Sequence, residues 1–271
     1  MKKHKMNCIL CTCLVSVFIT CFALSSCSTS EKETGSVTIR DNATIEDVDT
    51  PEEEPEETTT ADIIQYEITH TTFTHQMNTL GREEYCGVVE ITNTGTTCLY
   101  LDDCTFDFED NNGHLLQSEK YITSAPSVIA PNEKGYFFSS GWLDEGVSLD
   151  NGINLVPVFT IAKCEDGEDA IIDYDISDLD IRDEDYDMGV KITGRITNNT
   201  NEETNSIDVM IVAVFYDSNG DILAVDFTYA DAMSAGGQSS FEISTMFGND
   251  SLTTDEVADY QVFARHDYYQ F

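Results

Sequence analysis

The sequence predicts an all-β protein built from two similar units in tandem. Short apolar runs with a period of two are separated by Asn, Gly and Pro, which is typical of antiparallel strands and their turns. The clearest run, Ile207–Phe215, leads into Asp217-Ser-Asn-Gly220, where an Asn-Gly pair supplies the positive φ that a tight hairpin needs. No stretch shows the period of a long amphipathic helix. Hydrophobic residues form 41% of the 271 residues, enough for a folded core.

An internal repeat with a period of about 105 residues is the second observation. The matching segments keep their order along the chain, which indicates two homologous domains at 62–164 and 165–271. Each holds six or seven short strands in about 100 residues, so each is predicted to be an antiparallel immunoglobulin-like β-sandwich. The matching segments are Ile63–Ile68 with Ile171–Ile176, Glu90–Asn93 with Arg195–Asn198, and Asp110–Gly113 with Asp217–Gly220.

Alternation assigns faces to the two longest runs. In the second unit both faces are apolar toward the end of the run, which predicts an interior strand covered on both sides. The inner faces are predicted to be Ile207, Val209, Ile211, Ala213 and Phe215 in the second unit, and Tyr100, Asp102, Cys104, Phe106 and Phe108 in the first. Further strands are expected at 136–142, 155–162, 241–246 and 259–265.

The first 26 residues have the features of an export signal. A basic start precedes an apolar run, Ile9–Leu24, of about 16 residues, which is short for crossing a bilayer. The run ends in Leu24-Ser-Ser-Cys27, which resembles the lipobox of bacterial lipoproteins. That resemblance implies that Cys27 is lipidated, becomes the mature N-terminus and anchors the chain to a membrane of the cell envelope, facing outward. An ordinary cleaved signal and an uncleaved anchor helix are the alternatives.

Residues 27–61 are predicted to be a disordered acidic tether. Their core, Pro51–Thr60, combines prolines, like charges and few apolar residues, and such a segment stays extended. The whole chain has 13 basic and 51 acidic residues, a formal net charge of −38. This balance argues against nucleic acid as a partner, because phosphates need Lys and Arg. It also restricts membrane contact to the anchor.

Four cysteines follow the N-terminal region, at Cys86, Cys98, Cys104 and Cys164. Four cysteines allow three pairings, and the sequence does not choose among them. These four contain no C-x-x-C pair, which argues against a zinc site among them. Cys104 is expected to be a small buried apolar residue or half of a bridge.

A resemblance emerges from the second unit. It contains Ile192-Thr-Gly-Arg-Ile-Thr-Asn198, a strand that ends in Phe215-Tyr-Asp217, and a Gly-rich turn before Ser-Ser-Phe241. This pattern is similar to the FxLYD-type domain, a small β-sandwich of bacterial and archaeal surface lipoproteins. The first unit keeps the spacing in Phe106–Asp110, but Val89 stands where the second unit has Gly194. The resemblance implies a fold and no particular ligand.

No catalytic motif is present, so the chain is predicted not to be an enzyme and to need no cofactor. His70 and His75 should lie on opposite faces of a strand and are expected to be surface residues. The acidic run Glu165–Asp187 is expected to be a solvated face, and the alternative is a calcium site formed by Asp183, Asp185 and Asp187. Trp142, Tyr268 and Tyr269 are candidate recognition aromatics, and core packing is their alternative role.

These features favour a surface-anchored bacterial lipoprotein with a non-catalytic function. Its role is expected to be binding, adhesion or envelope scaffolding toward a protein or glycan partner. The alternative is a solute-, glycan- or calcium-binding component of a larger envelope or transport complex.

Overall fold

The computed structural model describes residues 33–34, 36–37, 63–77, 81–147, 149–184, 189–245 and 252–268. In these residues the chain forms strands β1–β16 and one short 3-10 helix, η1 (Gly167–Ala170). This confirms the all-β class. The predicted signal peptide, Cys27 and most of the tether lie outside the described residues. None of the described residues belongs to a helix long and apolar enough to cross a membrane.

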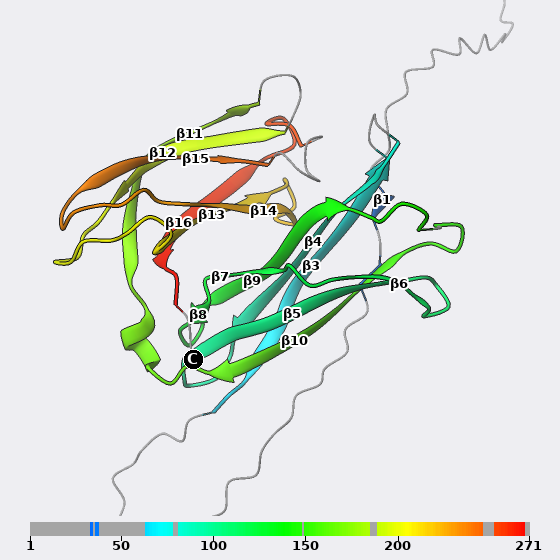
Figure 1. Ribbon diagram of the computed structural model, residues 1–271, viewed down its shortest axis with the longest axis horizontal. Helices are drawn as coiled ribbons and strands as arrows, with labels where there is room; N and C mark the ends of the chain where they lie inside the picture. The colour runs from blue at the N-terminus through cyan, green and yellow to red at the C-terminus, as the bar shows by residue number, and fades with distance from the viewer. Residues whose placement is uncertain are drawn as a thin grey trace, which may run out of the picture. The chain divides into compact units, whose positions relative to one another are not determined.

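The N-terminal half, residues 63–164, forms two sheets that pack face to face around an apolar core, and each sheet gains one two-residue strand from residues 33–37 (Figure 1). Fully buried Phe73, Phe106 and Phe108 lie in this core. The pairings are antiparallel except that of β2 with β10, which is parallel. The first sheet has the order β1 (Glu33–Thr34), β3 (Tyr66–Met77), β4 (Glu83–Asn93), β9 (Lys134–Trp142), β7 (Thr123–Ala125). The second has the order β2 (Ser36–Val37), β10 (Asn154–Lys163), β5 (Leu99–Glu109), β6 (Leu115–Glu119), and β8 (Val128–Ile129) also pairs with β5.

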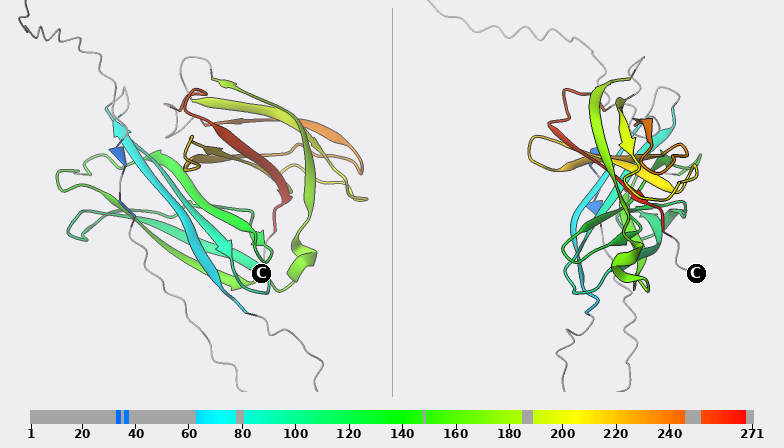
Figure 2. Two further views of the ribbon diagram at one scale, coloured as in Figure 1. Left: turned by 180° about the vertical axis from the view of Figure 1, so that it is seen from behind. Right: turned by 90° about the vertical axis from the view of Figure 1, so that its left-hand side faces the viewer.

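The C-terminal half, residues 165–268, forms one six-stranded antiparallel sheet that curls like half a barrel (Figures 1 and 2). The curl arises at β11, which pairs with β16 through Asp173 and Tyr174 and with β12 from Asp175 onward. The curled sheet closes around buried Ile192, Phe215 and Ile243. The third sheet has the order β14 (Ile222–Tyr229), β13 (Val209–Tyr216), β16 (Asp259–His266), β11 (Asp173–Asp183), β12 (Val190–Thr197), β15 (Gln238–Ser244).

Two buried asparagines, at matching positions of the two sequence segments, make similar hydrogen bonds. The side-chain amide of Asn93 donates to the carbonyl oxygens of Thr97 (2.8 Å) and Ile129 (3.1 Å). The amide of Asn198 donates in the same way to Glu202 (2.7 Å) and Ser234 (3.2 Å). Each asparagine is fully buried and ties the end of its strand to two loops, which satisfies backbone groups that would otherwise be buried without partners.

The two turns after the long strands are also equivalent. The Asp110 carboxylate accepts backbone N–H bonds from Asn112 and His114, and the Asp217 carboxylate accepts them from Asn219 and Asp221. These hydrogen bonds overcome partial desolvation and hold the pKa of both aspartates below the usual range. In both turns the glycine predicted from the sequence adopts a positive φ, 78° at Gly113 and 86° at Gly220.

The predicted inner face of β5 is wrong over its first half. Asp102 is exposed and Tyr100 is only half-buried, whereas Leu99 and Leu101 are buried in their place. The register with β10 shifts at this point, so that Thr160 pairs with Asp103 and Ile161 with Leu101. Asp102 is therefore the extra residue of a β-bulge, which reverses the alternation of side chains along the strand. From Cys104 to Phe108 the predicted face is confirmed.

Ile207 was predicted to begin the inner face of the long strand, and it does not. The strand begins at Val209, while Ile207 lies in the preceding turn, 67% exposed and with φ of 76°. A β-branched residue is strained in this left-handed conformation. The turn is held by Asp208, whose carboxylate accepts from the backbone N–H and the side-chain amide of Asn205.

Replacing Ile207 with glycine should therefore raise the free energy of unfolding, by about 1 kcal/mol, because glycine adopts the same φ without strain. Urea denaturation of the two proteins measures the difference. Leu115→Gly is the matched control, since Leu115 is also exposed but lies in strand β6, where glycine should destabilise. An Ile207→Gly protein no more stable than the parent would contradict the assignment of strain.

The two halves share one apolar core. Cys86, Val88 and Phe138 on the first sheet belong to the same buried cluster as Val212 and Val214 on β13. The rings of Phe138 and Phe227 meet edge to face with centroids 5.9 Å apart. The first sheet is thus buried on both faces: Tyr85, Val89 and Ile91 of β4 join the core of the N-terminal half, and the alternate residues join the shared core.

An ionisable group lies on the third sheet at Asp226, opposite Ala213 in the pairing of β14 with β13. Burial raises the pKa of its carboxyl to about 7, although the Phe227 N–H donates to the carboxylate at 2.8 Å and favours the ionised form. The folded chain holds this proton more tightly than the unfolded chain. The contribution of Asp226 to the free energy of unfolding is therefore fully present below about pH 4 and is lost as the pH rises toward 7.

Asp226→Asn should therefore stabilise the protein by roughly 2–4 kcal/mol at pH 8 and change its stability little at pH 4. Urea midpoints at the two pH values measure this difference. Asp231→Asn is the control, because Asp231 is exposed and its substitution should have the same small effect at both pH values. Equal effects of Asp226→Asn at pH 4 and pH 8 would show that folding does not raise the pKa of Asp226.

Candidate functional site

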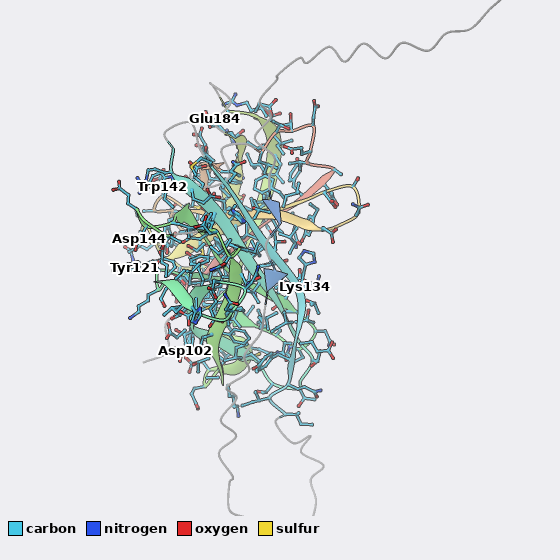
Figure 3. All side chains as sticks on the ribbon, turned by 90° about the vertical axis from the view of Figure 1, so that its right-hand side faces the viewer. Asp102, Tyr121, Lys134, Trp142, Asp144 and Glu184 are labelled. Atoms are coloured by element: carbon cyan, nitrogen blue, oxygen red, sulfur yellow. The ribbon has the colours of Figure 1, made fainter. Side chains whose placement is uncertain are left out.

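The most prominent candidate recognition surface surrounds Trp142, the last residue of β9 (Figure 3). Trp142 is the single tryptophan of the chain, and it is 38% exposed. The indole Nε1–H donates to Glu84 Oε1 at 3.1 Å, and the guanidinium carbon of Arg82 lies 4.6 Å from the ring centroid. The cation–π contact and the hydrogen bond hold the indole in one orientation.

Strand pairing explains how these three residues meet. Glu84 lies opposite Trp142 in the antiparallel pairing of β4 with β9, and Arg82 immediately precedes β4. Glu84 is only 3% exposed, so the indole N–H is hydrogen-bonded to a buried carboxylate. We name Arg82, Glu84 and Trp142 the Trp142 platform. It offers an aromatic surface with an adjacent cation, which suits stacking against a sugar ring or packing against an apolar group of a protein.

One of the two histidines does not lie at the surface as predicted. His75 was predicted to be a surface residue, but it is 8% exposed and its Nδ1 lies 2.6 Å from Glu83 Oε1. His70 is elsewhere, at the contact between β3 and β14, where its Nε2 accepts the backbone N–H of Ile222 at 3.2 Å. Thr72 donates to the carbonyl of the same residue at 2.7 Å. The two histidines therefore do not share a site.

Tyr268 lies where the two halves join. Its hydroxyl donates to Asp166 Oδ2 at 2.7 Å, its backbone N–H donates to Ser127, and its ring packs edge to face on Tyr100. The hydrogen bond to Asp166 raises the pKa of this phenol. These contacts all lie within the chain, which corresponds to the packing role given above as the alternative. Tyr269 lies outside the described residues.

At this joint the side chain of Arg265 donates hydrogen bonds to three residues. Its guanidinium is bidentate to Glu133, with Nη1–Oε2 3.0 Å and Nη2–Oε1 2.9 Å. It also donates to Asp173 Oδ1 from Nε at 2.8 Å and to the carbonyl of Val128 at 3.0 Å. Arg265 is 8% exposed, so these bonds lie in a partly desolvated environment and link β16 and β11 to β8 and to the turn that follows it in the N-terminal half.

Two grooves open beside the contacts between the halves. Neither converges on a set of groups positioned for nucleophilic or general acid–base chemistry among the described residues. The larger, of about 390 Å³, is lined by His70, Thr71, Thr72, Thr74, Asp221, Ile222 and Leu223. The smaller, of about 290 Å³, is lined by Pro126, Asn132, Glu133, Lys134, Tyr136, Gln261, Phe263 and Arg265.

Asp183 is exposed, and both of its carboxylate oxygens bind Thr254, through the backbone N–H at 2.7 Å and the hydroxyl at 3.0 Å. Asp185 and Asp187 lie outside the described residues. Within the described part of the chain, no three His, Cys, Asp or Glu side chains are grouped so that they could hold a metal ion.

Trp142 is the one predicted recognition residue that the structure leaves exposed among those it describes. Arg82 and Glu84 could not be singled out beforehand, because nothing in the sequence pairs β4 with β9. Cys27 lies outside the described residues.

No family model matches the chain, and no curated protein matches it significantly. Among solved structures, the chain is similar to the crystal structure of red sea bream transglutaminase with a TM-score of 0.22 and 12% sequence identity. The match covers 73% of this chain and 30% of that one. A likeness at this level assigns neither a family nor an activity.

Proposed function

We propose that the protein is a bacterial envelope lipoprotein, anchored through lipidated Cys27 and facing outward, that acts as a non-catalytic binding or adhesion module. In this proposal residues 62–164 and 165–271 are two immunoglobulin-like sandwiches of the FxLYD type. An acidic tether, residues 27–61, holds them away from the membrane. The ligand is a glycan or a protein surface of the envelope or its surroundings.

The facing sheets of the N-terminal half and the curled sheet of the C-terminal half support the sandwich description. The repeated Asn93 and Asn198 networks support a common origin of the two units. The observation that carries the binding role is the Trp142 platform, because an ordered, exposed tryptophan on a rigid strand is a strong anchor for a ligand.

The binding role is tested with whole cells that display the full chain. Adhesion to immobilised envelope polymers, host glycans and host proteins is compared for the parent, Trp142→Ala and Tyr121→Ala. Tyr121 is the matched control, since it is 92% exposed and lies outside the Trp142 platform. We expect at least a tenfold loss for Trp142→Ala and none for Tyr121→Ala. Equal adhesion of all three proteins would refute the role of the Trp142 platform. Which immobilised material the cells adhere to distinguishes a glycan ligand from a protein ligand.

The anchor is tested separately by Cys27→Ala, which removes the thiol that would carry the lipid. We expect the protein to be released from the membrane fraction into the medium or the periplasm. Retention of Cys27→Ala in the membrane fraction at the parent level would contradict lipidation at this residue. The parent labelled with a radioactive fatty acid supplies the positive control.

A further inference from the structure

Two of the four cysteines after the N-terminal region lie directly opposite each other. The pairing of β5 with β10 ends at Leu99 and Lys163, so the next residues in register are Cys98 and Cys164. The Cys164 N–H donates to the Cys98 carbonyl at 2.9 Å and extends the ladder by one step. Residues opposite each other in an antiparallel pair have Cα atoms about 4.5–5.5 Å apart, within the range of about 4.4–6.8 Å that disulfides span.

The surroundings of these two cysteines favour a bridge. Cys98 and Cys164 are 4% and 0% exposed, and both belong to one small apolar cluster with Val128 and Ala170. Burial raises the pKa of the Cys98 thiol, and the neighbouring Cys164 raises it further, as expected for two sulfurs close together.

The other two cysteines cannot pair with each other. Cys104 lies in the core between the first two sheets, and Cys86 points to the opposite face of β4, into the core that the two halves share. Strand β4 therefore separates them. Across from Cys104 on β10 is Phe159. Cys104 also cannot reach Cys164, which lies five residues beyond Phe159, or Cys98, which lies six residues away along the same extended segment. Each of the three complete pairings of four cysteines needs one of these excluded pairs, so only a single bridge can form, and Cys98 and Cys164 are the pair that the register places together.

We propose that Cys98 and Cys164 form a disulfide in the exported protein, while Cys86 and Cys104 remain thiols. The oxidising compartment rests on the proposed function, whereas the pairing rests on the strand register alone. The oxidant is a disulfide of a thiol–disulfide oxidoreductase. One protein thiolate attacks that disulfide and forms a mixed disulfide. The second protein thiolate then displaces the oxidoreductase, which leaves as a dithiol with two electrons and two protons.

The bridge would act on the joint between the halves. Cys164 is the last residue before the connection that contains Asp166 and η1, and Tyr268 binds Asp166 and packs beside the same cluster. A bond from Cys164 to β5 fixes the start of that connection. It also closes the chain from residue 98 to residue 164, which limits the freedom of the unfolded state.

The test begins with the full chain, reduced, unfolded and refolded in a glutathione redox buffer. Free thiols are alkylated, and a non-reducing digest is mapped by mass spectrometry, with the N-terminal cysteines assigned separately. We expect one peptide pair that joins Cys98 to Cys164, and alkylation at Cys86 and Cys104. Alkylation at all four, or a bridge at Cys86 or Cys104, would overturn the proposal. This result does not depend on export, so the Cys27→Ala experiment can fail independently.

A second measurement follows the melting temperature with and without reductant. The refolded parent should lose on the order of 10 °C on reduction, because the closed loop is long. Cys98→Ala and Cys164→Ala should lose this sensitivity. Cys104→Ala, which removes an equally buried thiol, should keep it. Reductant sensitivity that persists in Cys98→Ala would also exclude the assigned bridge.

Discussion

Replacing Phe215 with alanine should lower the free energy of unfolding by about 3–5 kcal/mol, and the loss should be visible from the other half of the molecule. Phe215 is fully buried in β13, an interior strand of the third sheet. Trp142 is the only tryptophan and lies in the first sheet. Since the shared core joins the two halves, the fluorescence of Trp142 should report the damage at Phe215.

The measurement is urea denaturation of the full chain followed by Trp142 fluorescence and by far-ultraviolet circular dichroism. We expect the two midpoints to fall together in Phe215→Ala, as in a single cooperative transition. Tyr229→Ala is the control, because Tyr229 is 36% exposed at the end of β14 and should cost much less. A fluorescence midpoint that stays at the parent value would mean that the halves unfold independently.

Arg265→Met should cost about 2–4 kcal/mol at neutral pH, because it leaves Glu133 and Asp173 without their shared partner while keeping most of the apolar side chain. The two carboxylates are partly exposed, at 38% and 64% for their side chains, which keeps the effect below that of a fully buried pair. Arg195→Met is the matched control. Its guanidinium is exposed and 3.7 Å from Asp178, so the change should stay within about 0.5 kcal/mol.

The effect of Arg265→Met should also depend on pH. Burial alone would raise the pKa of Glu133, but the hydrogen bonds from Arg265 and from the Ala130 N–H hold it below its usual value of 4.5. A carboxyl with a lowered pKa stabilises the fold above its unfolded pKa and loses this contribution as the pH falls. The cost of Arg265→Met, read from urea midpoints, should therefore shrink between pH 7 and pH 3. A cost unchanged across this range would argue that the ion pairs contribute nothing.

Much of the fold could be predicted because its strongest signals are local. The turns at Asp110 and Asp217 need a carboxylate that binds the next backbone N–H groups and a glycine with positive φ, and both lie within four residues. The repeat was visible for the same reason. The alternation within β13 also predicted an interior strand covered on both faces.

What could not be predicted depends on register and on contacts between distant segments. The alternation of apolar residues does not reveal the bulge at Asp102. The inner and outer faces of β5 were therefore exchanged in the prediction for the residues up to Asp102. The apolar residues of β4 indicate that both faces of this strand are buried. They do not indicate that the third sheet covers one of these faces. In the Trp142 platform, Glu84 and Trp142 are 58 residues apart and meet only through the pairing of β4 with β9.

The shared core has a consequence for how this chain could have evolved. In a string of independent repeats each unit can be deleted, duplicated or exchanged, because its outer surface is polar. Here Val88 and Phe138 on one side and Val212 and Phe227 on the other have become complementary. Either unit alone would expose an apolar sheet face to water. The two halves thus constrain each other's substitutions as the subunits of an obligate dimer do.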